Sequence, residues 1–240
     1  MTHKTATNST ARRRTALVTG GSRGIGRAIA HELGKDHHIL VGGTSPDTVA
    51  DAVKSLPSAE PFVADLTDAE QLAAAWKRVE AEGLDVLVHS AGVAWAAEIG
   101  EADPTQWQRM FEINVFAVAE LTRLALPALR DAGGQVIAIN SGAGHSSRAG
   151  NGLYSGSKFA LRAFTDALRD EESGRVRVTS IHPGRVDTSM QEQLQRSMGN
   201  DDYDGSIYVA PESVAATVRL AVDMPPESVV PELSIRPTQA

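Results

Sequence analysis

The stretch GGSRGIGRAI, residues 20–29, decides the fold of this chain. It follows the short apolar run 15–20 and opens segment 24–35, whose apolar residues at 25, 28, 29 and 33 have helical spacing. Glycines at 20, 24 and 26 permit a tight turn and a close ligand approach, and a helix start offers free N–H groups to an anion. The stretch therefore indicates a phosphate-binding turn, with an ordinary strand-to-helix turn as the alternative.

Short apolar runs alternate with longer amphipathic segments along the rest of the chain. Further strands are expected at 38–43, 60–66, 84–92, 134–141, 176–184 and about 229–237. Helices are expected at 45–56, 67–83, 105–131, 151–172 and near 211–223. Runs such as VLVH and VIAI are apolar throughout, which is typical of parallel strands covered on both faces. We predict an α/β fold, a single Rossmann-type domain over 15–240 with a doubly wound parallel sheet of about seven strands and helices on both faces.

Composition narrows the class of protein. The 240 residues carry a net charge of −7, which favours solubility and argues against nucleic acid as the main partner. The absence of cysteine excludes a disulfide framework, a cysteine-based zinc site and a cysteine nucleophile. No apolar run has the length of roughly 18 residues that spans a membrane, and the start lacks the apolar core of a signal peptide, so we expect a cytoplasmic protein.

Residues 1–14 differ in character from the rest, because they are basic, rich in Ser and Thr, and free of acidic residues. We expect a disordered N-terminal extension there. A targeting or phosphate-binding arm is the alternative.

Two motifs after the turn suggest chemistry. Tyr154 and Lys158 are four residues apart, so they project from one face of a helix, where an ammonium favours ionisation of a phenol. Ser141 ends an expected strand, at the edge of the sheet where ligands of such folds bind. A serine hydrolase is the competing interpretation, but no G-x-S-x-G sequence occurs around these residues.

Together these motifs resemble the short-chain dehydrogenase/reductase family, in its classical form, over about residues 14–237. TGGSRGIG (19–26) is similar to the family's T-G-x-x-x-G-x-G, and ADLTD (64–68) to its adenine-contacting segment. HSAG (89–92) stands where the family usually has N-N-A-G, so His89 and Ser90 depart from the pattern. HPGRVDTSM (182–190) resembles the segment that closes over the nicotinamide.

The resemblance implies four catalytic residues, namely Asn114, Ser141, Tyr154 and Lys158. It implies that Tyr154 exchanges a proton with the substrate oxygen, while Ser141 orients that oxygen and stabilises its charge. Lys158 is expected to lower the pKa of Tyr154 and to bind the nicotinamide ribose, and Asn114 to hold a water. The expected cofactor-binding residues are Tyr154 and Lys158 together with Gly20, Ser22, Arg23, Gly24, Ile25, Gly26, Gly43, Thr44, Asp65, Leu66, Ser90, Ala91, Gly92, Pro183, Gly184, Val186 and Thr188. No metal is expected.

The cofactor is expected to be NADP(H) rather than NAD(H). An NAD site places a carboxylate about 20 residues past the glycines, where this chain has Gly43 and Thr44. Arg23 stands where NADP-dependent family members carry a basic residue, although the arginine that many of them add at the Gly43 position is missing.

The expected function is therefore the interconversion of a ketone or aldehyde and an alcohol by hydride transfer, with Tyr154 as general acid/base. An NADP(H)-sensing regulatory or scaffold protein on the same fold is the alternative. By resemblance, homo-oligomerisation to a dimer or tetramer would use 105–131 and 151–172.

The expected substrate loop covers about 188–210. Within it, helical spacing relates Met190, Leu194 and Met198. These three residues, together with Trp95 and His145, are candidates for the substrate pocket, and the alternative is that they are packing or surface residues. The acidic segment 200–204 is interpreted as a solvated loop tip.

Overall fold

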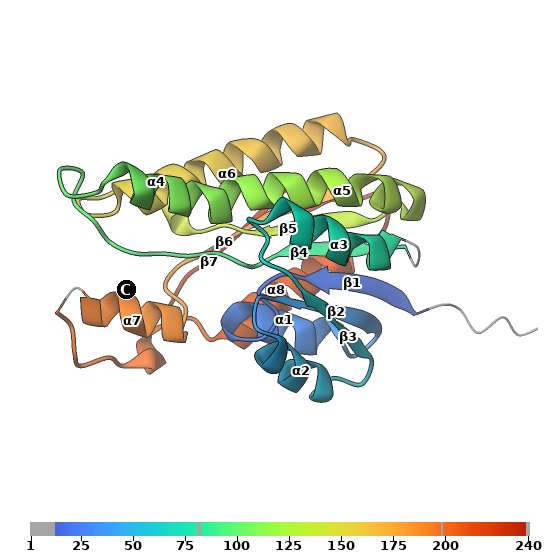
Figure 1. The fold of residues 1–240 in the computed structure, drawn as a ribbon, viewed down its shortest axis with the longest axis horizontal. Coiled ribbons are helices and arrows are strands. Elements are labelled where there is room, and N and C mark those ends of the chain that lie inside the picture. The colour runs from blue at the N-terminus through green and yellow to red at the C-terminus, as the bar shows by residue number, and fades with distance from the viewer. Residues whose placement is uncertain (1–12, 81–82, 198, 239–240) are drawn as a thin grey trace, which may run out of the picture.

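The computed structural model describes residues 13–80, 83–197 and 199–238, and one parallel sheet forms its centre (Figure 1). The strand order is β3-β2-β1-β4-β5-β6-β7, and every neighbouring pair is parallel. The strands are β1 (Arg14–Val18), β2 (His37–Gly43), β3 (Ala59–Val63), β4 (Val86–His89), β5 (Gln135–Ile139), β6 (Arg177–Pro183) and β7 (Glu232–Ile235). The predicted doubly wound sheet of seven strands is confirmed.

Helices cover both faces of the sheet. They are α1 (Gly24–Leu33), α2 (Pro46–Lys54), α3 (Ala69–Glu80), α4 (Pro104–Phe111), α5 (Ala117–Ala132), α6 (Gly152–Glu171), α7 (Ser189–Ser197) and α8 (Pro211–Val222). Short turns of other helix types are η1 (Glu112–Phe116), η2 (Gly142–Gly144) and η3 (Gly205–Ile207). Helices α1, α2 and α8 pack on one face, and α3, α5 and α6 on the other.

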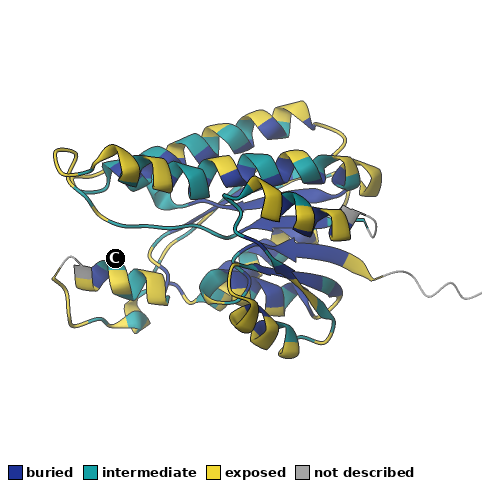
Figure 2. Ribbon diagram, in the orientation of Figure 1, coloured by how far each residue is buried: buried dark blue, intermediate teal, exposed yellow. Residues whose placement is uncertain are grey.

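Side chains that alternate between the two faces of the sheet divide the hydrophobic core into two layers. Within β1, Ala16 and Val18 pack with α1 and α8, whereas Leu17 between them packs with α3 and α5. Because successive side chains of a strand point to opposite faces, one apolar run supplies both layers. The strands are accordingly buried, while exposed residues are concentrated on the outer sides of the helices (Figure 2).

Local capping explains where two of the helices begin. Ser45 precedes α2, and its side-chain oxygen accepts a hydrogen bond from the N–H of Thr48. Asp103 precedes α4 and forms a capping box with Gln106, with Pro104 at the first helical position.

The single helix expected over 105–131 is divided in the structure. The five residues of η1 are π-helical, and they separate α4 from α5. Such a bulge inserts an extra residue into the helix and changes the direction of the side chains around it. Asn114 lies within this bulge.

Three other segments differ from expectation. The loop expected over 188–210 contains helix α7, and the last strand is limited to the four residues of β7. β1 begins at Arg14, one residue before the expected domain start, and Arg13 donates a hydrogen bond to the carbonyl of Lys35. The rest of the expected N-terminal extension lies outside the described residues.

Among the described helices, none combines the length and apolar character needed to cross a membrane.

Candidate active site

A cleft of about 640 Å³ lies beyond the carboxyl ends of β1, β2, β3 and β4. Strand order reverses between β1 and β4, and open α/β sheets bind their ligands at such a point. Fourteen of the expected cofactor residues line it: Gly20, Ser22, Arg23, Gly24, Ile25, Gly26, Gly43, Thr44, Asp65, Leu66, Ser90, Ala91, Gly92 and Thr188.

Glycine is required at two points of the turn after β1. Gly20 has a φ of +64°, and a Cβ there would lie 3.0 Å from the backbone of Ala91. A Cβ on Gly26 would lie 2.2 Å from the carbonyl oxygen of Gly20, so the first turn of α1 packs directly on the glycine turn. No side chain caps the N-terminus of α1 at Arg23, and its first turn contains no acidic residue. The turn therefore presents backbone N–H groups and the positive end of a helix dipole to the cleft.

Thr19, which was not expected in the site, joins the two strand ends. Its Oγ1 accepts hydrogen bonds from the N–H groups of Ser90 (3.0 Å) and Ala91 (3.1 Å), and donates to the carbonyl of Val88 (3.3 Å). The side chain is buried, so these bonds fix the loop after β4 against the turn after β1.

One end of the cleft is rich in hydroxyl groups. Ser22 and Arg23 line it from the glycine turn, and Thr44, Ser45 and Thr48 line it from the end of β2 and the start of α2. Ser45 and Thr48 were not expected there.

Packing explains the glycine at position 43. A Cβ on Gly43 would lie 2.7 Å from Cγ2 of Val49, so a larger residue there requires the Val49 side chain to move. Asp65 is the one acidic residue among the described lining residues.

Asp65 is held in its ionised form. Its Oδ1 accepts hydrogen bonds from the backbone N–H (2.9 Å) and the hydroxyl (2.7 Å) of Thr67. These bonds lower the pKa of the Asp65 carboxyl. Leu66 also lines this part of the cleft.

The structure brings the side chains of Ser141 and Tyr154 close together, and Ser141 acts on the pKa of Tyr154. Ser141 follows β5, and its Oγ accepts a hydrogen bond from the N–H of Ala143 (3.1 Å), while Tyr154 lies in the first turn of α6. Tyr154 retains some exposed surface, but its hydroxyl lies deep, and desolvation raises its pKa against the opposing effect of Ser141. The expectation that Lys158 lowers the pKa of Tyr154 stays a prediction.

Lys158 lies one turn further along α6 and points past the ring of Tyr154. Its Nζ donates to the carbonyl of Ile139 (3.1 Å) and lies 5.8 Å from the centre of the Tyr154 ring. The ammonium group therefore lies beside the Tyr154 ring. Burial also lowers the pKa of Lys158 to about 8, because desolvation disfavours the charged form.

Asn114 ties the loop after β4 to α6. Its Oδ1 accepts from the N–H of Val93 (2.9 Å), and its Nδ2 donates to the carbonyl of Val93 (3.0 Å) and to Oγ of Ser157 (3.0 Å). Ser157 in turn donates to the carbonyl of Tyr154 (2.8 Å). Ser157 was missed because a serine inside a helix gives no signal of this role. The water expected at Asn114 stays a prediction.

The segment after β6 reaches the cleft through Thr188 alone among its expected residues. Thr188 lies beside Gly24, where a Cβ on that glycine would be 3.5 Å from Cγ2 of Thr188. Pro183 ends β6, Gly184 donates to the carbonyl of Ile235 (2.7 Å), and Val186 is buried in the core. Cofactor contacts from these three residues stay predictions.

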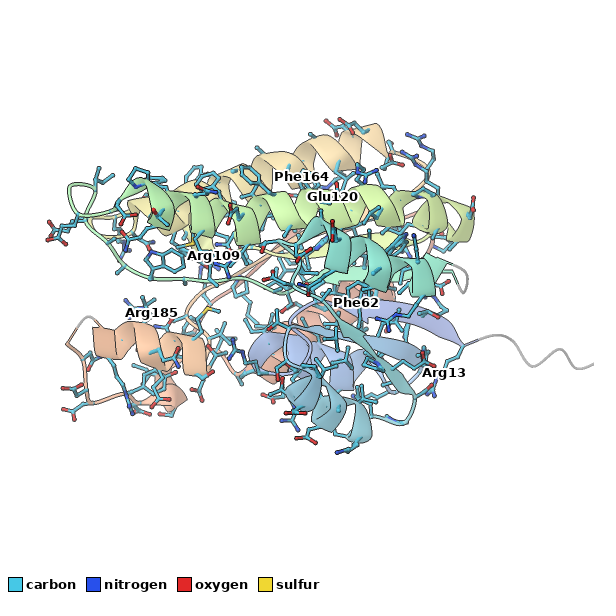
Figure 3. The ribbon with its side chains drawn as sticks, in the orientation of Figure 1. Arg13, Phe62, Arg109, Glu120, Phe164 and Arg185 are labelled. Atoms are coloured by element: carbon cyan, nitrogen blue, oxygen red, sulfur yellow. The ribbon has the colours of Figure 1, made fainter. Side chains whose placement is uncertain are left out.

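For several residues the sequence left open whether they line the pocket or serve as packing or surface residues. Trp95 and Met190 line the cleft, together with Arg109, Ile113, Val93, Ala94, Ser189 and Gln193, which were not expected. Figure 3 shows Arg109 on helix α4, on the side that faces α7. The Nε1 of Trp95 is buried without a hydrogen-bond partner. His145 instead contacts Glu232, and Met198 lies outside the described residues.

Comparison with known proteins agrees with this geometry. A family model described as short chain dehydrogenase matches residues 14–199. The chain is 30% identical over 248 residues to dehydrogenase/reductase SDR family member 11 from Bos taurus, covering 95% of this chain and 97% of that protein. It is also 30% identical over 234 residues to serine 3-dehydrogenase from Rhizobium radiobacter, covering 93% of each.

Among solved structures, the alcohol dehydrogenase of the archaeon Thermococcus sibiricus, complexed with 5-hydroxy-NADP, has a TM-score of 0.86. Its sequence is 26% identical, and the match covers 95% of this chain and 97% of that one. The chain belongs to the short-chain dehydrogenase/reductase family. It is thus an oxidoreductase of the NAD(P)-dependent type that acts on CH–OH groups.

His89, which departs from the family pattern, has a structural environment. It is buried at the end of β4, and its Nε2 lies 2.9 Å from Oγ1 of Thr122. Because the Thr122 hydroxyl donates to the carbonyl of Val118 (2.8 Å), His89 is the donor in this pair. Burial lowers the pKa of His89 to about 3.

We predict that His89 makes the fold sensitive to acid. In the unfolded chain His89 is protonated below about pH 6.5, whereas in the folded protein it is protonated only below about pH 3. The unfolded state therefore binds more protons between these two pH values, and the free energy of unfolding falls as the pH decreases from 6.5 to 3. Between pH 7 and pH 5 the wild type should lose about 2 kcal/mol more unfolding free energy than His89→Gln. Urea denaturation at the two pH values measures this difference, and equal losses would contradict the assignment.

Proposed function

We propose that this protein is an NADP(H)-dependent oxidoreductase that interconverts a ketone or aldehyde and an alcohol, with Tyr154 as general acid/base. The observation that carries the proposal is the proximity of Ser141 and Tyr154 at the carboxyl end of β5, beside the glycine-lined cleft. Lys158 and Asn114 support the pair from α6 and η1.

The cleft fits a dinucleotide. Bare backbone at the glycine turn and the uncapped start of α1 suit a pyrophosphate. Asp65 and Leu66 line the cleft and would hold the adenine, and Gly92 and Thr188 also line it. When bound, the nicotinamide supplies or accepts the hydride.

In the direction of reduction, Tyr154 donates its proton to the carbonyl oxygen of the substrate. Its raised pKa keeps the phenol protonated at neutral pH, so the acid is available. The Ser141 hydroxyl donates to the same oxygen and stabilises its developing negative charge. Lys158 is cationic below a pH of about 8, and its charge beside the ring stabilises the phenolate left by the transfer. Oxidation of an alcohol uses the same groups in reverse.

The preference for NADP(H) is supported by the hydroxyl-rich end of the cleft. Arg23 supplies a positive charge there, and Ser22, Thr44, Ser45 and Thr48 supply hydroxyl groups. Such donors suit a phosphate, whereas an NAD site uses a carboxylate on the ribose. The α2 dipole adds positive potential at its start. Position 43 holds glycine where many NADP-dependent family members carry arginine, and a side chain there would contact Val49.

The substrate would enter between the loop after β4 and helix α7, where Trp95, Ile113 and Met190 form an apolar wall and Gln193 a polar one.

We further propose a homo-oligomer, a dimer or tetramer, because Phe116 and Phe159 are exposed by 59% and 44% on the helical layer of α4, α5 and α6. A cytoplasmic location is proposed, because this compartment supplies the dinucleotide.

Replacement of Tyr154 by Phe should remove the proton donor and leave the shape of the site intact. We predict a fall in kcat of about 100-fold or more for reduction of a carbonyl substrate by NADPH. The dissociation constant of NADPH should stay within about twofold, because the glycine turn is untouched. Steady-state kinetics and fluorescence titration measure the two quantities.

Tyr208→Phe serves as the matched control, because Tyr208 does not line the cleft. Unchanged turnover in Tyr154→Phe would remove the acid/base assignment. Wild-type protein that binds NADPH but reduces no member of a broad carbonyl panel would favour the regulatory alternative instead.

Replacement of Arg23 by Ala tests the cofactor preference. Loss of one charge-assisted hydrogen bond should weaken NADPH binding by about 10- to 100-fold, while NADH binding changes little. Arg27→Ala is the control, because Arg27 lies one turn further along α1 and outside the cleft. Parallel titrations with both dinucleotides decide the question, and an equal loss for NADPH and NADH would contradict a 2′-phosphate contact.

A further inference from the structure

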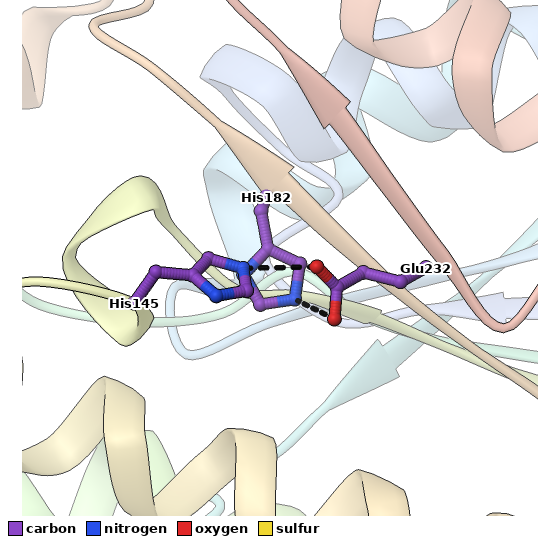
Figure 4. Close-up of side chains that lie close together, drawn as sticks. All are labelled: His145, His182 and Glu232. Atoms are coloured by element: carbon purple, nitrogen blue, oxygen red, sulfur yellow. Dashed lines mark ion pairs between the residues drawn. The ribbon is translucent and has the colours of Figure 1, made fainter.

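A cluster of two histidines and a glutamate lies behind Ser141, outside the described cleft (Figure 4). His145 follows η2, His182 lies in β6, and Glu232 begins β7. Nε2 of His145 is 3.0 Å from Oε1 of Glu232, and Nε2 of His182 is 3.7 Å from Oε2. The two imidazole rings are 4.3 Å apart between centres.

Hydrogen bonding sets the tautomer of His182. Its Nδ1 lies 3.0 Å from the carbonyl oxygen of Ser141, which only accepts, so Nδ1 carries the proton. Nε2 therefore bears the lone pair in the neutral form. His182 is fully buried, and this burial lowers its pKa, which favours the neutral ring. A histidine that donates one N–H to a backbone carbonyl and offers its other nitrogen is the usual form of a metal ligand.

We propose that His145, His182 and Glu232 form a binding site for a divalent cation of the zinc class. One ligand atom from each residue lies within 4.8 Å of the other two. Ligand atoms around tetrahedral zinc are separated by about 3.3 Å when each bond is about 2.0 to 2.1 Å. The separations of 3.0 and 3.7 Å run to the two different oxygens of Glu232, and all three ligand atoms lie within 4.8 Å of one another, so binding needs side-chain adjustments that bring them closer. Imidazole nitrogen with one carboxylate suits zinc better than calcium or magnesium.

The fourth ligand position would be taken by water. His145 and Glu232 are each partly exposed, so an ion can reach the cluster from solvent, whereas His182 forms its buried side. The Nδ1 of His182 donates to the carbonyl of Ser141, which orients the ring, and Arg236 donates to the backbone carbonyl of His182. A site with three protein ligands and an open position is well known for zinc.

Two neighbouring groups compete with a cation. Nε of Arg162 lies 3.7 Å from Oε2 of Glu232, and this buried Nε has no hydrogen-bond partner. Oγ of Ser180 lies 2.9 Å from Nε2 of His182, where its hydroxyl donates to the lone pair that a metal would take. The Arg162 charge should therefore reduce the affinity for a cation, and its removal should raise it.

The test is a titration of the purified, chelator-treated full chain with Zn²⁺, followed by calorimetry and by thermal unfolding. We expect about one tight equivalent of Zn²⁺ and a rise in Tm. His145→Ala should weaken binding by about tenfold or more, as should Glu232→Gln, because each removes one ligand. Arg162→Gln should tighten binding by about tenfold.

His31→Ala is the matched control, because His31 lies on α1, away from the cluster, and its binding should equal that of the wild type. His145 and Glu232 are partly exposed, so these variants should fold. Circular dichroism checks this point. Absence of Zn²⁺ binding in the wild type would overturn the proposal. So would equal affinity in the wild type and His145→Ala, or an affinity of Arg162→Gln no higher than that of the wild type.

Discussion

The hydrogen bonds of Thr19 to the loop after β4 set the geometry on which the rest of the site depends. β1 and β4 are neighbours whose connections run to opposite sides, so their ends diverge and leave a cleft. The Thr19 hydroxyl fixes the distance between the two ends through Ser90 and Ala91. Gly20 then has to pass close to Ala91, which is why a side chain is excluded there. The glycine turn and the loop that Asn114 anchors thus form a single rigid frame.

Desolvation governs the catalytic groups more than their direct contacts do. Tyr154 and Lys158 lie on adjacent turns of α6, but Nζ of Lys158 donates to Ile139 and passes the ring of Tyr154. Burial therefore raises the pKa of the phenol and lowers that of the ammonium to about 8, and both changes favour the neutral forms. A neutral phenol beside Ser141 suits proton donation, and the nearby cation suits stabilisation of the phenolate. The same physical effect keeps His89 neutral at the end of β4.

Much of this architecture could be predicted from the sequence because the patterns are local. The conformation of the nearby backbone follows from apolar strands such as 86–89, from caps such as Ser45, and from the glycines at 20, 24 and 26. Fourteen of the expected cofactor residues line the cleft. The π turn around Asn114 could not be predicted, since one extra residue leaves the hydrophobic pattern nearly unchanged. Helix α7 was missed as an element because its face is mostly polar.

Features that depend on distant residues escaped prediction for a different reason. The pKa of Tyr154 depends on how deeply its hydroxyl is buried, which no spacing reveals. His145, His182 and Glu232 come from three separate elements and meet only because β5, β6 and β7 are neighbours in the sheet. Thr48 reaches the cleft only through the packing of α2 beside the end of β2.

The most direct test of the account is hydrogen–deuterium exchange of the full chain with and without NADP⁺. The cleft should hold the dinucleotide, so exchange should slow in residues 20–26, 64–67 and 90–95, which line it, and stay unchanged in α8. Unchanged exchange in the three cleft segments at saturating NADP⁺, or protection confined to other parts of the chain, would contradict the central claim.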